Sequence, residues 1–156
     1  MKMLQLKVKR NELAKEFELM HIAKAGDVGL DIPVVLEDKG SITINPGERH
    51  LVPTGIKIEI PYGYWASIEA RSSTSKKSLI VPKGVIDEGY RGELFAQIIN
   101  VGKNPVHINH GDRLIQLIMH ERVIKDFDVI EVDELSESER GETGFGSSGQ
   151  SAKLVE

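Results

Sequence analysis

The stretch Ile56-Lys57-Ile58-Glu59-Ile60-Pro61-Tyr62-Gly63 contains one complete unit of this chain's architecture, a short strand followed by a turn. Three isoleucines alternate with two charged residues, and a period of two is that of a strand with one buried and one solvated face. Proline and glycine then favour a turn, because proline lacks a backbone N–H and glycine accepts a left-handed backbone. The pattern predicts a strand over residues 56–60.

Comparable short runs, separated by turn residues, recur along most of the chain. Further strands are predicted over residues 4–8, Ser41–Ile44, Trp65–Ala70, Glu93–Asn100, Pro105–Ile108, Arg113–Met119 and Asp128–Val132. Many short strands at close spacing predict an all-β fold, a jelly-roll-like barrel or sandwich. Two short helices are predicted in addition, near Thr74–Ser78 and around Glu12–Met20.

Composition limits the classes of function. The 156 residues are those of one domain with a sizeable core, and the apolar and charged fractions of 40% and 28% are typical of a soluble globular protein. No membrane span or export signal is evident, so we expect a cytoplasmic protein with no membrane partner. The chain has no cysteine, which excludes disulfides and thiolate metal sites. Its net charge of −4 argues against a nucleic-acid partner.

The chain changes character after Val132, where the apolar pattern gives way to acidic, Ser/Gly-rich sequence ending in Arg140-Gly141-Glu142-Thr143-Gly144-Phe145-Gly146-Ser147-Ser148-Gly149. Glycines let backbone N–H groups turn toward an anion, the arginine suits a phosphate, and the aromatic ring suits a base. A frayed, solubilising terminus is the other interpretation. The organisation predicted is a β domain over residues 1–134 and a flexible arm over residues 135–156 that closes over an active site.

Three other segments combine polar side chains with turn residues, namely Gly26–Asp31, Ala70–Lys77 and Gly84–Gly92. Each has an ordinary structural explanation when taken alone. An aspartate in a glycine-rich segment often caps a turn, and a lone arginine often forms a surface ion pair. The segments become informative only as an ordered set.

Taken in order, five segments resemble the five sequence motifs of the homotrimeric dUTPase family. They are Gly26–Asp31, Arg71–Ser73, Gly84–Gly92, Gly111–Ile118 and Arg140–Gly149. The resemblance covers nearly the whole chain and implies the jelly-roll-like β fold of that family. It also implies a homotrimer with shared active sites and hydrolysis of dUTP to dUMP and pyrophosphate in the presence of Mg²⁺.

The resemblance further implies roles for individual residues. Asp87 takes the place of the general base, and Tyr90 that of the ring against which deoxyribose packs. Backbone groups of a hairpin that includes Val85 and Ile86 would read the uracil edge. Phosphate binding is implied for Arg71, Ser72, Ser73 and Gln116, with Arg140, Gly146, Ser147 and Ser148 closing over them. Phe145 would stack on the base, Asp31 would support the site, and Mg²⁺ would be held by phosphates and water with no side-chain ligand.

Two alternatives belong to other classes of function. The first is a dCTP deaminase of the same fold, whose catalytic glutamate lies three residues before the asparagine that ends the following strand. In this chain that position is Gln97, before Asn100, and an amide cannot shuttle protons as a carboxylate does. The second is a non-catalytic nucleotide-sensing module, which is not expected to retain a complete set of catalytic side chains.

Overall fold

The computed structural model describes residues 4–123 and 127–139 of the chain. The chain divides into two units, Met1–Lys125 and Asp126–Glu156. In the described residues 127–139 of the second unit there is neither helix nor strand. None of the helices found in the described residues has the length and apolar character that crossing a membrane requires.

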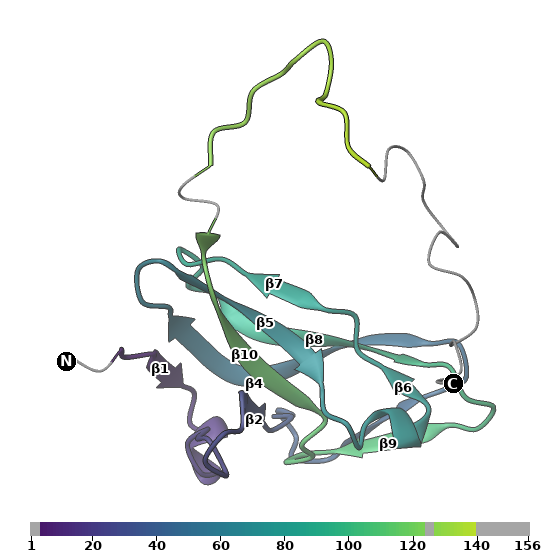
Figure 1. The fold of residues 1–156 in the computed structure, drawn as a ribbon. Helices are drawn as coiled ribbons and strands as arrows, with labels where there is room; N and C mark the ends of the chain where they lie inside the picture. Colours follow the sequence, from purple (N-terminus) through teal and green to yellow (C-terminus); the bar gives the residue numbers. More distant parts are fainter. Residues whose placement is uncertain (1–3, 124–126, 140–156) are drawn as a thin grey trace, which may run out of the picture. The chain divides into compact units, whose positions relative to one another are not determined.

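In the first unit, the regular secondary structure is almost entirely strand (Figure 1). The strands are β1 (Lys7–Arg10), β2 (Gly29–Ile32), β3 (Ser41–Ile44), β4 (Arg49–Glu59), β5 (Tyr64–Ala70), β6 (Leu79–Ile80), β7 (Gly84–Ile86), β8 (Glu93–Asn100), β9 (Val106–Asn109) and β10 (Ile115–Glu121). Among the described residues, the single-turn 3-10 helices η1 (Ala14–Glu16) and η2 (Ser75–Lys77) interrupt them.

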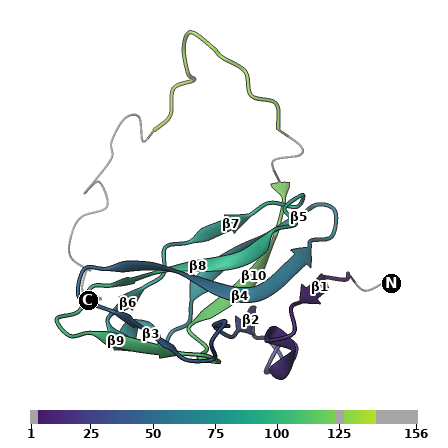
Figure 2. The ribbon, with the colours of Figure 1, turned by 180° about the vertical axis from the view of Figure 1, so that it is seen from behind.

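The strands form two four-stranded sheets and a two-stranded ribbon. One sheet has the order β1-β4-β8-β6, the other β2-β10-β5-β7, and β3 pairs with β9. In Figure 1, β10, β5 and β7 run side by side in one layer with β4 and β8 behind them, and Figure 2 shows the same layers from the other side. The all-β, jelly-roll-like fold predicted from the alternation of apolar residues is therefore confirmed.

The core lies between the two larger sheets, because each contributes its apolar alternate residues to a single cluster. The inward side chains include Ile56, Leu94 and Ile98 from one sheet and Ile68, Ile115 and Leu117 from the other, all at most 2% exposed. In β8 these buried residues alternate with more exposed ones such as Phe95 and Gln97, as the period of two requires.

Several predicted elements match the structure, and others do not. The strands Ser41–Ile44 and Glu93–Asn100 have the predicted bounds, whereas the strand predicted over Asp128–Val132 is wrong. Val129 and Ile130 in that segment are 93% and 76% exposed, and alternation alone does not make a strand where no neighbouring strand accepts its hydrogen bonds. The helix predicted around Glu12–Met20 is reduced to the single turn η1.

The segment that includes Val85 and Ile86 was expected to form a hairpin, and in the structure it does not. β6 pairs with β8 in one sheet, and β7 pairs with β5 in the other, so residues 79–86 pass from sheet to sheet and do not fold back on themselves. These strands have two and three residues, which is too short for a periodic pattern to show in the sequence.

A buried amide holds the end of β8 in place. Asn100 is fully buried, and its Nδ2 donates to the carbonyls of Ile44 and Asn104, each at 2.8 Å. Its Oδ1 accepts the N–H of Gly102 at 2.9 Å. One side chain therefore joins the end of β3, the end of β8 and the loop that leads to β9.

Asn100→Ala should lower the free energy of unfolding by about 3 kcal/mol, because it leaves these buried groups without partners. Urea unfolding at fixed protein concentration measures the effect. Asn104→Ala is the matched control, since only the backbone carbonyl of Asn104 takes part, and it should change stability by less than about 0.5 kcal/mol. Equal effects of the two substitutions would contradict this role for the buried amide.

Candidate active site

A cluster of charged residues gathers where β2, β5 and β10 lie side by side. Asp31 in β2 is the register partner of Gln116 in β10, and Arg71 directly follows β5. Arg71 Nε lies 2.8 Å from Asp31 Oδ1, and Arg113 Nη1 lies 3.5 Å from Asp31 Oδ2. One carboxylate thus faces two guanidinium groups, which leaves the cluster positive and suited to an anion with several oxygens.

The turn after β5 fixes Arg71 and exposes the two serines that follow it. The Arg71 N–H donates to the Leu114 carbonyl at 3.1 Å, and Arg71 Nη1 donates to the Arg113 carbonyl at 3.0 Å. Thr74, which is buried, donates its hydroxyl to the same Leu114 carbonyl at 2.6 Å. Because Thr74 holds the end of the turn inward, Ser72 and Ser73 remain exposed beside the cluster.

The side chain of Gln116 lies against Gly29 as it extends toward this cluster. Its Nε2 donates to the Ala70 carbonyl at 2.9 Å, while its Oε1 lies against Gly29 in the neighbouring strand β2. A Cβ atom at position 29 would collide with that amide oxygen. The glycine therefore leaves room for the Gln116 amide, which a side chain at position 29 would displace.

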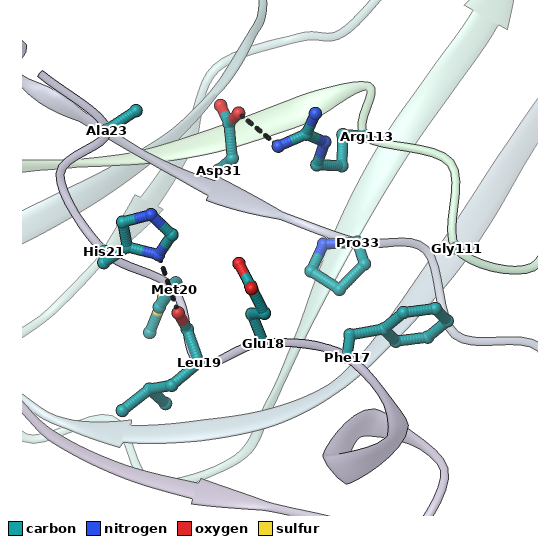
Figure 3. Close-up of a pocket in the computed structure, with 10 residues that line it drawn as sticks. All are labelled: Phe17, Glu18, Leu19, Met20, His21, Ala23, Asp31, Pro33, Gly111 and Arg113. Carbon is teal, nitrogen blue, oxygen red and sulfur yellow. Dashed lines mark hydrogen bonds and ion pairs between the residues drawn. The ribbon is translucent and has the colours of Figure 1, made fainter.

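A hollow of about 220 Å³ adjoins the cluster and is shown in Figure 3. Asp31 and Arg113 line one side of it, and the segment 17–23 lines the other, with apolar contributions from Phe17 and Met20. The side chain of Arg113 is 63% exposed, so its guanidinium remains accessible to solvent although it faces Asp31. The sequence did not single out Arg113 as a candidate site residue, although it lies in the fourth motif, and the structure places it beside Asp31.

A second hollow, of about 350 Å³, contains the predicted base. It is lined by Leu51, Val85, Ile86, Asp87, Tyr90, Glu93 and Phe95. Asp87 and Tyr90 belong to the turn after β7, in which the Tyr90 N–H donates to the Asp87 carbonyl at 3.0 Å. The Tyr90 hydroxyl donates to the Glu93 carbonyl at 2.9 Å, which fixes the direction of the ring.

Polar residues lie between the two clusters on β5 and its neighbours. The Ser67 hydroxyl donates to Glu69 Oε1 at 2.7 Å and lies 2.8 Å from His120 Nε2, and the His120 ring stacks on Trp65 at 4.1 Å. The Ser67 hydrogen bond, followed by Lys83 at 3.1 Å, lowers the pKa of Glu69 below its ordinary value. These contacts occupy Ser67 and Glu69, which therefore do not act as free catalytic groups.

The two clusters are separated within one chain. Asp87 follows Ile86, whose register partner in β5 is Ala66. Arg71 lies five residues beyond Ala66, which at the rise of a strand is about 17 Å. A general base acts on a water within hydrogen-bond distance, so Asp87 and Arg71 of the same chain do not serve one phosphate group.

The predicted site residues thus fall into three groups. Asp31, Arg71, Ser72, Ser73 and Gln116 are brought together at one end of β5. The second group, at the other end, consists of Val85, Ile86, Asp87 and Tyr90. Arg140, Phe145, Gly146, Ser147 and Ser148 lie outside the described residues.

The fold and the arginine-containing cluster define a class, an all-β sandwich with a cluster whose guanidinium groups suit a phosphate-bearing ligand. The chain matches the dUTPase family model over residues 15–149, and it therefore belongs to the dUTPase family.

Individual relatives agree with this assignment. A deoxyuridine 5'-triphosphate nucleotidohydrolase of Caldanaerobacter subterraneus subsp. tengcongensis is 43% identical over 147 residues, which cover 92% of this chain and 97% of the relative. One from Gloeothece citriformis is 41% identical, with coverage of 92% and 97%. Among solved structures, a Staphylococcus bacteriophage 80alpha dUTPase with dUPNHPP is 28% identical, with a TM-score of 0.82 and coverage of 94% and 99%.

The contact between Gly29 and Gln116 can be tested by substitution of the glycine. Gly29→Ala should push the Gln116 amide aside and weaken binding of a deoxynucleoside triphosphate by roughly tenfold, the effect of losing one hydrogen bond to a charged group. Isothermal titration calorimetry with a non-hydrolysable triphosphate measures this change.

Gln116→Ala supplies the reference for this prediction. Because Gly29 acts through Gln116, adding Gly29→Ala to Gln116→Ala should cost no further affinity. A further loss of affinity in the double variant would show that position 29 affects the ligand by another route.

Proposed function

We propose that this chain hydrolyses dUTP to dUMP and pyrophosphate. Membership of the dUTPase family supports the proposal, as do relatives named deoxyuridine 5'-triphosphate nucleotidohydrolase at about 40% identity. The observation that carries the proposal is that this chain presents both kinds of group that the reaction needs. The exposed carboxylate of Asp87 lies in one hollow, and the positively charged cluster around Asp31 lies beside another.

Asp87 acts as the general base in this proposal. Its side chain is exposed, and within the described residues its carboxylate has no hydrogen-bond or ion-pair partner. It takes a proton from a water molecule, whose oxygen forms a bond to the α-phosphorus as the bond to the bridging oxygen breaks. The pyrophosphate leaves with that oxygen, and a positioned base of this kind contributes about 10²- to 10⁴-fold to the rate.

Recognition of the nucleoside falls to the hollow around Asp87. The Tyr90 ring, held by its hydroxyl bond to Glu93, would pack against deoxyribose and leave no room for a 2′-hydroxyl. Backbone groups near Val85 and Ile86 would read the uracil edge. A rigid hollow excludes a larger ligand more strongly than it penalises a missing methylene.

Binding of the phosphates falls to the cluster around Asp31. Arg71 and Gln116 would hold phosphate oxygens, and the accessible guanidinium of Arg113 joins them. Such donors stabilise the negative charge that builds up on the leaving group. The exposed hydroxyls of Ser72 and Ser73 lie within the same turn. Arg140, Gly146, Ser147 and Ser148 would close over the phosphates, and Phe145 would stack on the base.

We infer that Mg²⁺ is held by the phosphates and by water. The donor set supports this, since the carboxylate in the cluster, Asp31, already faces Arg71 and Arg113 and its charge is largely compensated. Asp31 would therefore face the ion through water. When bound, the ion would supply additional positive charge to the phosphates.

The separation of the two clusters supports a homotrimer with shared sites. Asp87 of one copy would meet the Arg71 cluster of another, since the two lie about 17 Å apart along β5 in one chain. An apolar surface adjoins Asp87, because Leu51, Val85 and Phe95 are 64%, 62% and 41% exposed. Contiguous exposed apolar side chains of this kind favour contact between protein molecules. Closed cyclic symmetry then makes all sites equivalent.

Assays of the purified protein with Mg²⁺ and a panel of deoxynucleoside triphosphates test the proposed reaction. We expect pyrophosphate release from dUTP, with little from dTTP or UTP. Asp87→Asn should lower kcat by roughly 10²- to 10⁴-fold while substrate binding is retained, because the amide keeps the shape of the side chain and cannot accept the proton.

Asp38→Asn, a carboxylate-to-amide change in an exposed loop, is the matched control and should leave kcat within about twofold of the unsubstituted protein. Ammonia release from dCTP at a comparable rate would favour a deaminase and contradict the proposal. Near-normal turnover by Asp87→Asn would mean that another group is the base.

A further inference from the structure

We propose that Glu88 is a positioning residue for Asp87, and that Arg122 acts through Glu88. The inference rests on the proposed function, in which Asp87 is the base. The carboxylate of Asp87 has no partner within the described residues, so its own contacts do not fix its place. Besides the backbone bond from Tyr90 to Asp87, the side chain of Glu88 anchors this turn to the rest of the fold.

Glu88 is bound on two sides by groups from distant parts of the chain. Its Oε2 accepts the backbone N–H of Gly63 at 2.8 Å and lies 3.2 Å from Arg122 Nη2. The side chains of Glu88 and Arg122 are 27% and 31% exposed, so both are withdrawn from solvent for most of their surface. Charge-assisted hydrogen bonds of this kind are shorter and stronger than neutral ones.

Gly63 connects the two charged residues through its backbone. Its N–H is donated to Glu88, and its carbonyl accepts the N–H of Arg122 at 2.7 Å. Gly63 is buried and has a φ of +85°, a left-handed conformation that favours glycine. Tyr62 completes the arrangement, with its ring 5.6 Å from the Arg122 guanidinium. The β4–β5 turn, the β7–β8 turn and the end of β10 are thus joined in a closed ring of contacts.

The alternation of side chains transmits this anchoring to Asp87. Residues 84–88 alternate between half-buried and exposed, and this alternation continues past β7 into the turn, where Glu88 is half-buried and Asp87 is exposed in its hollow. Arg91 adds a second restraint, because its Nη1 donates to the Glu88 carbonyl at 2.8 Å. Glu88 is therefore held at both its side chain and its backbone, and this restrains the direction of the adjacent Asp87 side chain.

Arg122 contributes to this arrangement without touching the hollow. It is not among the residues that line the hollow of Asp87, and its Nη2 is directed at Glu88. Its role is to compensate the charge of a largely withdrawn carboxylate. Loss of Glu88 would leave both the Gly63 N–H and Arg122 Nη2 without this acceptor.

The test compares Glu88→Ala, Glu88→Gln and Arg122→Ala in steady-state dUTP hydrolysis, with thermal unfolding measured alongside. Glu88→Ala should lower kcat by about tenfold or more with KM changed by less than about threefold, because small displacements of a base reduce turnover steeply. Glu88→Gln should recover most of the loss, since its amide oxygen still accepts the Gly63 N–H. In Glu88→Ala/Arg122→Ala, kcat should equal that of Glu88→Ala alone.

The matched control is Glu12→Ala, which removes the exposed Lys15–Glu12 ion pair beside η1 and should leave kcat unchanged within about twofold. A kcat of Glu88→Ala within twofold of an active unsubstituted protein would overturn the inference. Equal losses in Glu88→Ala and Glu88→Gln would also overturn it, even where Glu88→Ala folds poorly. An unsubstituted protein without dUTP hydrolysis would instead overturn the proposed function.

Discussion

The pairing of β5 with β7 on one side and with β10 on the other determines where every described site residue lies. The β5–β10 register carries Arg71 and Gln116 to one end of the sheet, beside Asp31 on β2. The β5–β7 register carries Asp87 to the other end. Backbone hydrogen bonds fix these registers, and a shift by one residue would turn the side chains of a strand to the opposite face of the sheet. The two halves of the candidate site are therefore held apart within one chain.

The two ends of the sheet also differ in charge. The chain carries a net charge of −4, and yet the cluster at Asp31 presents two guanidinium groups against one carboxylate. Within the part of the chain that the structure describes, the carboxylate of Asp87, the proposed base, has no hydrogen-bond or ion-pair partner, whereas Glu88 beside it is held on both sides. The free carboxylate of Asp87, on an anchored turn, suits proton transfer. The carboxylate of Asp31 lies between two arginines and suits the orientation of their guanidinium groups.

The sequence alone predicted the strands and their buried faces better than it predicted contacts between side chains that are distant in the chain. A period of two identifies which face of a strand is buried, and it located Ser41–Ile44 and Glu93–Asn100 with their bounds. It does not identify the neighbouring strand, and for that reason the strand expected over Asp128–Val132 was wrong. Arg113 was missed for the same reason, since its approach to Asp31 depends on long-range pairing. The ordered motifs indicated the family, which the comparison with relatives confirmed.

The central claim is that Asp87 and Arg71 of different copies form one site. Mixing Asp87→Asn with Arg71→Ala, each inactive alone, and allowing subunits to exchange tests it most directly. In a cyclic trimer every mixed assembly regains one intact site of three, and random equal mixing makes about three-quarters of the trimers mixed, so about one-quarter of the unsubstituted activity should return. Activity no greater than the sum of the two separate variants would contradict the account.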